Sequence, residues 1–440
     1  MGARASDADE VHAGVRNSAA DGQPANIGRA REATPISTPV ETARPALTPH
    51  ERRSVGALAA IYATRMLGLF LLLPVLALYA RQLPDYTPEL LGLTMGAYGL
   101  TQALLQIQFG RWSDRYGRKP VITVGLVLYA AGSLIGAFAH SVAILFLARC
   151  VQGAGAVSAA VTALLADLTR PEVRTRAMAF VGISIGLSFV LALVLAPVLD
   201  AVVGVPGIFV IMLAMALTGL VLLHVAVPVE PVRTGGAEAR QLAEMKDILT
   251  RPELRPLYAG VFALHFIMTA TFLSVPQVLA TDLGIAIATH WKVYLGVFVA
   301  SLVGTVPLIL ATERGGRGGL VFVAAVLLVG CAQGLLGLDH RHLWRVLAAL
   351  TLFFAVFNYL EARLPALLTQ AAPGTDRGAA LGIFATAQFL GAFCGGALGG
   401  ILLGQFGLSG VFWGSAVVAV AWAAVAAAGG TGRPIRHGHA

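Results

Sequence analysis

Charged side chains are scarce in this chain. Asp, Glu, Lys and Arg make up 12% of its 440 residues, whereas 57% of the residues are hydrophobic. Soluble globular proteins carry about 25% charged residues. A chain this apolar would expose large adhesive surfaces in water. The composition therefore argues against a soluble globular protein and favours one whose solvent is lipid.

Patterns that identify enzymes and disulfide-linked proteins are missing as well. Cys150, Cys331 and Cys394 lie in apolar stretches, so we interpret them as small buried hydrophobes rather than a disulfide set or metal ligands. No zinc-ligand spacing, Ser-His-Asp pattern or Walker sequence occurs, which argues against an enzyme, a cofactor and an ATP-driven pump. Residues 1–50 lack an apolar core, so we expect no cleavable signal peptide.

Long apolar stretches are what the chain has instead. An α-helix of about 20 residues spans a hydrocarbon core of about 30 Å. Helices are expected because a backbone in lipid must satisfy its own hydrogen bonds. The predicted helices are 55–80, 90–110, 119–139, 142–166, 174–198, 207–228, 256–281, 291–311, 319–338, 343–370, 377–404 and 408–429.

These twelve predicted helices fall into two sets of six. A charged, Pro-containing cytoplasmic linker at 229–255 separates an N-terminal bundle (51–228) from a C-terminal bundle (256–429). Within the linker, 238–249 is a candidate for an amphipathic surface helix. We interpret residues 1–50 as a disordered cytoplasmic tail and 430–440 as a second cytoplasmic tail. Weak similarities about 200 residues apart support a plan of two related halves.

The cations, which give a net charge of +8, occupy short loops rather than one face of a domain, so we expect no nucleic-acid partner. Loops on one side hold only Arg81, Lys292, Arg341 and Arg345. Loops on the other side hold Arg111, Arg115, Arg118, Lys119, Arg170, Arg174, Arg176, Arg233, Arg240, Lys246, Arg251, Arg255, Arg314, Arg317 and Arg377. Because Lys and Arg concentrate on the cytoplasmic side, the bias predicts that both termini are cytoplasmic.

The strongest local signal is the segment Gly110–Lys119, which reads GRWSDRYGRK. It is a tight, charged turn between two apolar helices, where Gly110 and Gly117 permit a sharp reversal of the backbone. Asp114 lies at a helix end, within reach of Arg118. A loop that only sets the orientation of the helices in the membrane would need cations alone. The added Asp and the paired glycines therefore indicate a specific mechanical role.

This decapeptide resembles the cytoplasmic loop motif of the major facilitator superfamily, between its second and third helices. Arg149–Gly155 resembles the fourth-helix motif of proton-driven members, and Leu67–Val75 resembles the first-helix motif. The stretches that resemble the YajR-like inner-membrane branch are Asp167–Arg170, His290–Leu295, Phe357–Ala362 and Gln388–Gly391. The resemblance, over about residues 55–428, implies an all-α, multi-pass protein of a bacterial inner membrane. Its twelve helices would form two six-helix bundles related by a pseudo-twofold axis.

Two features depart from that pattern. The representative of the branch carries a soluble domain after the twelfth helix, whereas this sequence stops at Ala440, so we expect that domain to be absent. The fifth-helix motif of antiporters ends in Gly-Pro followed by paired glycines. Here the region reads APVLD over Ala196–Asp200, which weakens an antiport assignment.

The resemblance assigns a gating role to the loop motif. In this family its Asp, and an acidic residue at the end of the fourth helix, help hold the outward-open state. They match Asp114 and Asp167, with Arg118 and Arg174 as cationic partners. The whole predicted gating set is Gly110, Asp114, Arg115, Gly117, Arg118 and Asp167. Charge pairs at helix ends can bias two arrangements of rigid bundles.

Ionisable residues inside membrane spans are costly, which makes each a functional candidate. Glu361 is the best lone carboxylate of the second half, and His265 lies near the middle of the seventh helix. Arg149 matches the Arg that proton-driven members use to tune a protonatable partner. We predict that these three residues couple transport to protons. The alternatives are an Arg149 that braces helices through backbone carbonyls, and a hydrogen-bonded structural His265.

Polar residues on helix faces are candidates for a solute cavity. Gln102 and Gln106 are four residues apart and share one face of the second helix. Asn358 lies on the tenth helix, and the resemblance directs Gln388 of the eleventh toward the same region. Arg65 belongs to this set unless it lies at the cytoplasmic end of the first helix. The alternative for the glutamines is hydrogen bonding between helices.

These observations predict a monomeric secondary transporter that works by alternating access. Its expected partners are protons, a small-molecule solute and the lipid bilayer. The leading hypothesis is proton-coupled efflux, by antiport, of a small amphipathic organic solute or drug. Proton-coupled or facilitated uptake of a small metabolite is the second hypothesis, and the altered fifth-helix motif keeps it open. A non-transporting membrane sensor on the same fold is the third.

Overall fold

The computed structural model describes residues 47–228, 245–313, 317–372, 374 and 376–429. The predicted tails at 1–46 and 430–440, and the linker segment 229–244, lie outside the described residues. The described residues belong to one compact unit.

Every regular element in the described part of the chain is a helix. The first half contains α1 (Pro49–Leu71), α2 (Leu76–Ala80), α3 (Pro88–Tyr116), α4 (Arg118–Ala137), α5 (Val142–Ala154), α6 (Ser158–Asp167) and α7 (Pro171–Ala226). The second half contains a short helical segment at 245–250, α9 (Arg255–Gln277), a π-helical turn (Val278–Asp282), a 3-10 turn (Ile287–Thr289), α10 (His290–Glu313), α11 (Gly318–Leu338), α12 (Leu343–Ala371) and α13 (Arg377–Ala428).

Ten of the described helical ranges are long and apolar enough to cross a membrane. Two of the ten, α7 and α13, each consist of two helices joined at a glycine: Gly204 with φ 69° and Gly407 with φ 66°. Glycine adopts positive φ without a steric penalty, so one residue reverses the chain where the sequence predicted a short loop. Counting both parts of α7 and of α13 gives the predicted twelve spans.

Several boundaries differ from the sequence prediction. Helix α3 continues through most of the predicted turn to Tyr116, so that only Gly117 separates it from α4. Helix α1 begins at Pro49, inside the predicted tail, because the side chain of Thr48 accepts a hydrogen bond from the Glu51 backbone while Glu51 accepts one from the Thr48 backbone. The first span is interrupted near Pro74, which lacks a backbone N–H. The fourth span is interrupted at Gly155, between α5 and α6.

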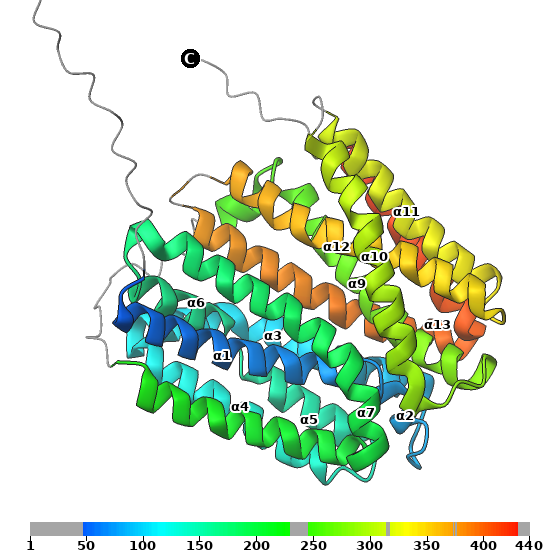
Figure 1. Ribbon diagram of the computed structural model, residues 1–440, viewed down its shortest axis with the longest axis horizontal. Helices are drawn as coiled ribbons and strands as arrows, with labels where there is room; N and C mark the ends of the chain where they lie inside the picture. The colour runs from blue at the N-terminus through cyan, green and yellow to red at the C-terminus, as the bar shows by residue number, and fades with distance from the viewer. Residues whose placement is uncertain (1–46, 229–244, 314–316, 373, 375, 430–440) are drawn as a thin grey trace, which may run out of the picture. The chain divides into compact units, whose positions relative to one another are not determined.

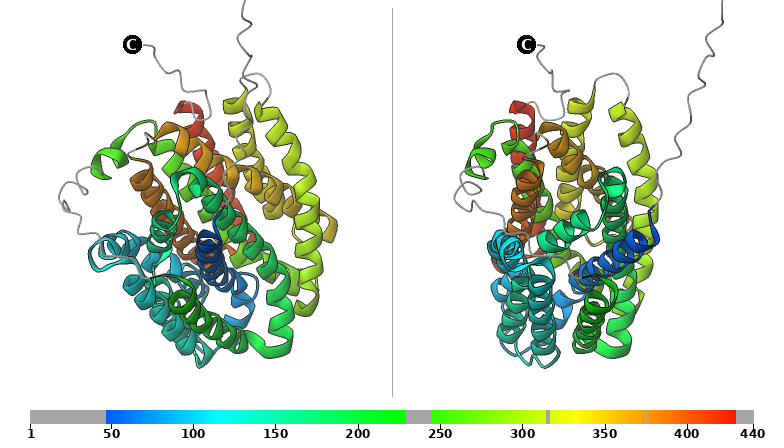
Figure 2. Two further views of the ribbon diagram at one scale, coloured as in Figure 1. Left: turned by 60° about the vertical axis from the view of Figure 1, so that its left-hand side comes forward. Right: turned by 90° about the vertical axis from the view of Figure 1, so that its left-hand side faces the viewer.

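The helices form two groups that pack against each other. In the first half, α1 and α4 pack on α7, and α5 packs between α3 and α4. In the second half, α9 and α11 pack on α13, and α10 packs on α12. Figures 1 and 2 show the helices of the first half, coloured blue to green, beside those of the second, whose colours run from the light green of α9 to the red end of α13. The halves meet mainly where α3 contacts α13 and where α7 contacts α10.

The two ends of this helical unit differ in how closely the halves approach. We call the end that carries Gly117 the motif end, and the end that carries residues 81–87, 283–289 and 339–342 the distal end. Toward the distal end, a Cβ atom added to Gly92 of α3 would lie 2.3 Å from the carbonyl oxygen of Gly396 of α13. Arg81 also donates a 3.0 Å hydrogen bond to Gln277 of α9. The halves are therefore held tightly together at the distal end.

Candidate functional site

A cavity of about 840 Å³ lies between the two halves. Side chains from α1, α3, α5 and α7 line it on one side, and side chains from α9, α10, α12 and α13 on the other. Gly182 and Gly186 of α7 are part of its wall, and no heavy atom lies within 4 Å of where their Cβ atoms would be.

Aromatic rings make up much of the cavity wall, which the sequence analysis did not anticipate. Phe189 of α7 meets Phe70 edge-on at 5.1 Å between ring centroids and stacks on Phe357 of α12 at 6.4 Å. Phe298 and Phe389 also line the cavity. The available sequence signal was the placement of Phe357 and Phe389 directly beside the polar candidates Asn358 and Gln388. Such a wall suits an apolar or aromatic ligand surface.

Three predicted polar residues, each from a different helix, meet in this cavity. His265 of α9 has its Nε2 atom 3.8 Å from a carboxylate oxygen of Glu361 on α12. The same Nε2 atom lies 2.7 Å from the amide nitrogen of Gln388 on α13. The Glu361 side chain is 42% exposed and that of His265 is 7% exposed. A carboxylate that water can reach thus lies beside a buried imidazole.

The hydrogen-bond partners of His265 determine which protonation states of its imidazole ring are compatible with the structure. Its Nδ1 atom lies 3.2 Å from the carbonyl oxygen of Val261, which can only accept, so Nδ1 carries a proton. In the neutral ring, Nε2 then accepts the hydrogen bond that the Gln388 amide donates. In the charged ring, Nε2 becomes a donor, for which the Glu361 carboxylate is the nearest acidic acceptor. The arrangement can therefore hold a proton on either Glu361 or His265.

Asn358 also lines the cavity, one helical turn before Glu361, and it donates a 3.3 Å hydrogen bond to Ser301 of α10. Arg363, two residues after Glu361 on α12, is not among the lining residues.

Arg149 lines the cavity from the first half although it is only 2% exposed. It donates a 2.9 Å hydrogen bond to Gln152, and its guanidinium lies 5.0 Å from the centre of the Tyr98 ring. Among the described residues, no carboxylate comes within 4 Å of it. Its charge is therefore stabilised by an amide and an aromatic face, rather than by the backbone carbonyls of the alternative interpretation.

Three predicted cavity residues, Arg65, Gln102 and Gln106, are not among the residues that line the cavity. Arg65 donates hydrogen bonds to Gln102 at 2.7 Å, to Ser158 at 3.0 Å and to the carbonyl of Gly155 at 2.7 Å. Gln106 donates a 3.4 Å hydrogen bond to a carbonyl of α13. These buried polar groups turn toward one another, because an unpaired polar group would be costly there. Arg65 is 3% exposed and lies in the interior of α1 (Pro49–Leu71) rather than at its start.

The predicted gating residues lie together at the motif end. Arg118 forms an ion pair with Asp114 at 2.5 Å and another with Asp167 at 3.3 Å, and it donates a 2.7 Å hydrogen bond to Ser113. Gly117 makes the turn with φ 95°, a conformation that favours glycine. Arg118 thereby joins the ends of α3, α4 and α6.

Arg174, Arg115 and Gly110, the other predicted residues at the motif end, do not take part in the ion pairs of Arg118 described above. Arg174 donates to the carbonyl of Thr169 at 3.3 Å rather than to either gating carboxylate. The Arg115 guanidinium lies 5.4 Å from the centre of the Tyr116 ring, and Gly110 faces α6 with Ala159 as its nearest neighbour.

An ion pair at the motif end was missed by the sequence analysis. Glu51 accepts hydrogen bonds from Arg170 at its Nε (2.9 Å), its Nη2 (3.1 Å) and its backbone N–H (3.1 Å). The pair joins the start of α1 to the start of α7. The available signal was the N-cap pattern of Thr48 and Glu51 just before the first apolar run.

The sequence pattern of the Major Facilitator Superfamily matches residues 58–359 and 257–437 of this chain. The chain belongs to this superfamily. It is 40% identical over 381 residues to the inner membrane transport protein YajR of Escherichia coli (strain K12), and the match covers 86% of this chain and 84% of YajR. It is 25% identical over 345 residues to multidrug resistance protein 2 of Bacillus subtilis (strain 168), which covers 76% and 85% of the two chains.

Solved facilitator structures have the same fold. A bacterial homologue of the human lysosomal transporter Spinster, in an inward-facing and occupied conformation, superimposes with a TM-score of 0.72 at 14% identity, covering 87% of this chain and 97% of its own. The predicted fold class and the predicted YajR-like branch are therefore confirmed. The chain is a multi-pass facilitator-superfamily transporter of small molecules, and not an enzyme.

Proposed function

We propose that this transporter couples the export of a small amphipathic organic solute to the import of protons across the bacterial inner membrane. The supporting observation is the cluster of Glu361, His265 and Gln388 inside an aromatic cavity between the two halves. A solute with an apolar body fits the phenylalanine wall. Its polar group would compete with a proton for Glu361, so that only one of the two occupies the site.

We propose that the motif end faces the cytoplasm, because the short loops there carry most of the cations. The tight distal contact between α3 and α13 then closes the cavity on the periplasmic side. A cysteine at Lys246 should resist an impermeant thiol reagent applied to intact cells, whereas a cysteine at His342 should react. Reaction at position 246 alone would reverse the proposed orientation.

Proton coupling follows from a change in exposure. A carboxylate keeps its charge more easily in water than in an apolar site, because burial removes the solvation of the charged form. We propose that rocking of the halves changes the exposure of Glu361, so that it takes up a proton on one side and releases it on the other. His265, with its second nitrogen held by Val261, would receive or return that proton.

The variant Glu361→Gln tests this proposal, because glutamine imitates the protonated acid without being able to release a proton. With ethidium as the probe in inverted vesicles, we expect gradient-driven uptake to fall by at least about tenfold, a barrier change of about 1.4 kcal/mol. Counterflow, which needs no net proton movement, should persist. We expect His265→Ala to give a smaller change, seen as a shift in the pH dependence of uptake.

Two results would contradict the coupling role of Glu361. Loss of both activities in Glu361→Gln would indicate a structural role, and retention of both would place the coupling group elsewhere, with Asp167 and Asp200 next to test. If the wild-type protein carries out counterflow but ignores an imposed pH gradient, facilitated uptake becomes the better account. The altered Ala196–Asp200 segment favours that alternative.

A further inference from the structure

A groove runs along the outside of the second half, between α10 and α12. It consists of three adjoining hollows of about 520, 430 and 510 Å³. Leu343 and Leu347 line both the first and the second hollow, and Leu347 and Thr351 line both the second and the third. The three hollows therefore adjoin one another in a row, which we call the α10–α12 groove and which starts at the distal end.

The sequence explains why the groove has a smooth apolar floor. Lys292, Gly296, Ala300 and Gly304 recur every four residues along α10, so they share one face of that helix. Residues 343, 347, 351 and 355 recur in the same way along α12. Gly296 is exposed, and no heavy atom lies within 4 Å of where its Cβ would be. Small residues on one wall and leucines on the other leave room for a slender apolar ligand as far as Gly304, where α10 touches α12 and an added Cβ would lie 2.9 Å from the Cβ of Ala355.

The groove has the length of one membrane leaflet. Lys292 and Gly304 are separated by twelve residues, which is about 18 Å at 1.5 Å rise per residue. One leaflet accounts for about 15 Å of a hydrocarbon core about 30 Å thick. A ligand that fills the groove therefore reaches from the membrane surface to near the midplane, as an acyl chain does.

Cations gather at the distal mouth of the groove. Among the described residues, no carboxylate lies within 4 Å of the side-chain nitrogens of Lys292 or Arg341, both of which line the hollows. The two carboxylates nearby are already engaged: Asp282 lies 3.1 Å from His340, and Asp339 pairs with His342 and Arg345. The mouth thus leaves two cations without an acidic partner.

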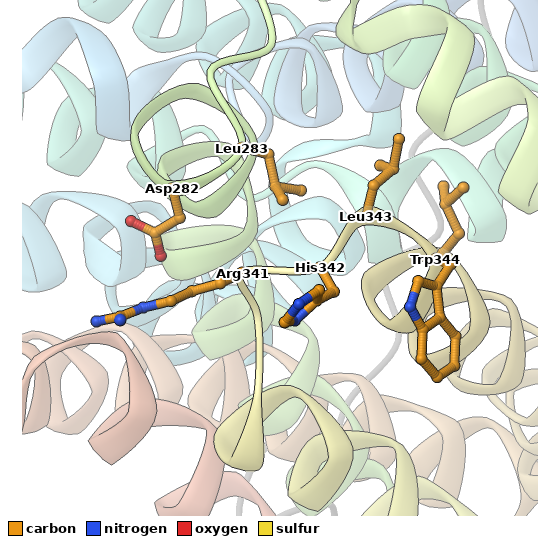
Figure 3. A pocket seen from close by; sticks show the side chains of 7 residues that line it. Asp282, Leu283, Arg341, His342, Leu343 and Trp344 are labelled. Carbon is orange, nitrogen blue, oxygen red and sulfur yellow. The ribbon is translucent and has the colours of Figure 1, made fainter.

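The mouth also has the aromatic residues that are typical of a membrane surface. Trp344 is 64% exposed, and Lys292 lies 5.8 Å from the centre of the neighbouring Trp291 ring. Figure 3 shows Trp344 at one end of the first hollow and Arg341 beside Asp282 at the other, with His342 between them. Tryptophans at the headgroup level place this mouth at the membrane–water interface.

We propose that the α10–α12 groove binds an anionic phospholipid. The phosphodiester would accept hydrogen bonds from the Lys292 ammonium and the Arg341 guanidinium, which are strong phosphate donors. One acyl chain would lie along Gly296, Ala300 and Gly304. The charge of the mouth selects an anionic headgroup over a zwitterionic one, and the length of the groove selects a lipid over free phosphate. The lipid belongs to the leaflet at the distal end.

Native mass spectrometry of the purified full-length protein tests the headgroup contacts, with dioleoylphosphatidylglycerol and dioleoylphosphatidylcholine as probes. We expect wild-type protein to retain phosphatidylglycerol in preference to phosphatidylcholine. The double variant Lys292→Ala/Arg341→Ala should bind phosphatidylglycerol at least about tenfold more weakly. The control Arg52→Ala/Lys246→Ala removes two exposed cations at the motif end and should bind as wild type does.

A second variant tests the acyl chain. Gly296→Leu places a side chain in the groove at a position where an added Cβ meets no heavy atom within 4 Å, and we expect it to weaken phosphatidylglycerol binding by at least about tenfold. The control Gly56→Leu adds the same side chain to an open position on α1 and should bind normally. Millimolar inorganic phosphate should not displace the lipid. Equal binding of both lipids, equal loss in the charge control, full binding by Gly296→Leu, or displacement by phosphate would each overturn the proposal.

Discussion

At the scale of single residues, the site depends on groups that are far apart in sequence but adjacent in space. Glu361, His265 and Gln388 come from α12, α9 and α13, and each has another of the three within 4 Å. Arg118 plays the corresponding part at the motif end, where it pairs with Asp114 and with Asp167. Both clusters consist of charges or protons shared between helices, so a small change in helix position changes their energy.

Asp114→Asn should slow transport without preventing folding. The substitution keeps the shape of the side chain and removes its charge, so the pair with Arg118 is lost while Arg118 retains Asp167. Because Asp114 is partly exposed, we expect only about a two- to fivefold loss of ethidium transport rate. The matched control is Asp247→Asn, which removes an exposed i,i+4 pair outside the motif. Equal rates for wild type and Asp114→Asn would remove Asp114 from the gate.

The cost of ionisable groups in lipid made Glu361, His265 and Arg149 predictable from sequence, and all three line the cavity. Arg65, chosen as a charged residue in a span, and Gln102 and Gln106, chosen because they share a helix face, do not line it. Sequence spacing shows that two residues share a helix face. It does not show whether that face points to a cavity or to a neighbouring helix, because this depends on how each helix is rotated in the bundle.

At the scale of elements, Asp85 holds the start of α5. Its carboxylate accepts hydrogen bonds from the backbone N–H groups of Ala143 at 3.0 Å and Val142 at 2.6 Å, and these lower its pKa below the ordinary aspartate value. A carboxyl group with a lowered pKa in the folded state stabilises that state at pH values above its ordinary pKa of about 3.9. The contribution is lost as the pH falls through the lowered pKa.

We therefore expect Asp85→Ala to lower the melting temperature at neutral pH by about 1 to 3 °C. The difference from wild type should shrink at about pH 3 and below, because the wild-type carboxyl is then increasingly protonated. Differential scanning fluorimetry at neutral pH and at about pH 3 measures the difference in melting temperature between variant and wild type under each condition. A melting difference that stays constant across this range would mean that the charge of Asp85 contributes nothing to the cap.

The contact of α3 with α13 gives a second prediction at this scale. A Cβ atom on Gly396 would lie 2.5 Å from the carbonyl oxygen of Gly92, so Gly396→Leu forces the two helices apart at the distal end. We expect transport to fall by about tenfold, because overpacking of this kind costs about 1 to 3 kcal/mol. A cysteine placed at the buried cavity position Met95 should then react faster with an impermeant reagent from the distal side.

Two comparisons make the Gly396→Leu result specific. Gly56→Leu, at an open position on α1, should transport and label like wild type. If Gly396→Leu also behaves like wild type, the glycine contact does not close the distal end.

The helices themselves were predictable from apolar length, whereas the merging of two spans at Gly204 and at Gly407 was not. One glycine with positive φ replaced each expected loop.

At the scale of the whole transporter, three features matter together: a closed distal end, a cavity between the halves, and a carboxylate in that cavity that water reaches. Sequence resemblance gave the two-bundle plan, and the family match confirms it. Which end of the transporter is closed depends on packing between segments that are distant in sequence, such as the hydrogen-bonded pair Arg81 and Gln277. A local sequence pattern does not reveal such contacts. Under the proposed coupling, alternating access requires that these contacts open when Glu361 exchanges a bound proton for solute.

Proton release on solute binding tests the central claim most directly. Purified protein in a weakly buffered solution is mixed with ethidium while a pH indicator records protons and fluorescence records binding. If solute and proton compete for Glu361, wild-type protein releases up to about one proton per ethidium bound, with a maximum at the pH where Glu361 is mostly protonated. Glu361→Gln should bind ethidium and release none. Wild-type binding without proton release at any pH between about 5 and 9 would contradict the account.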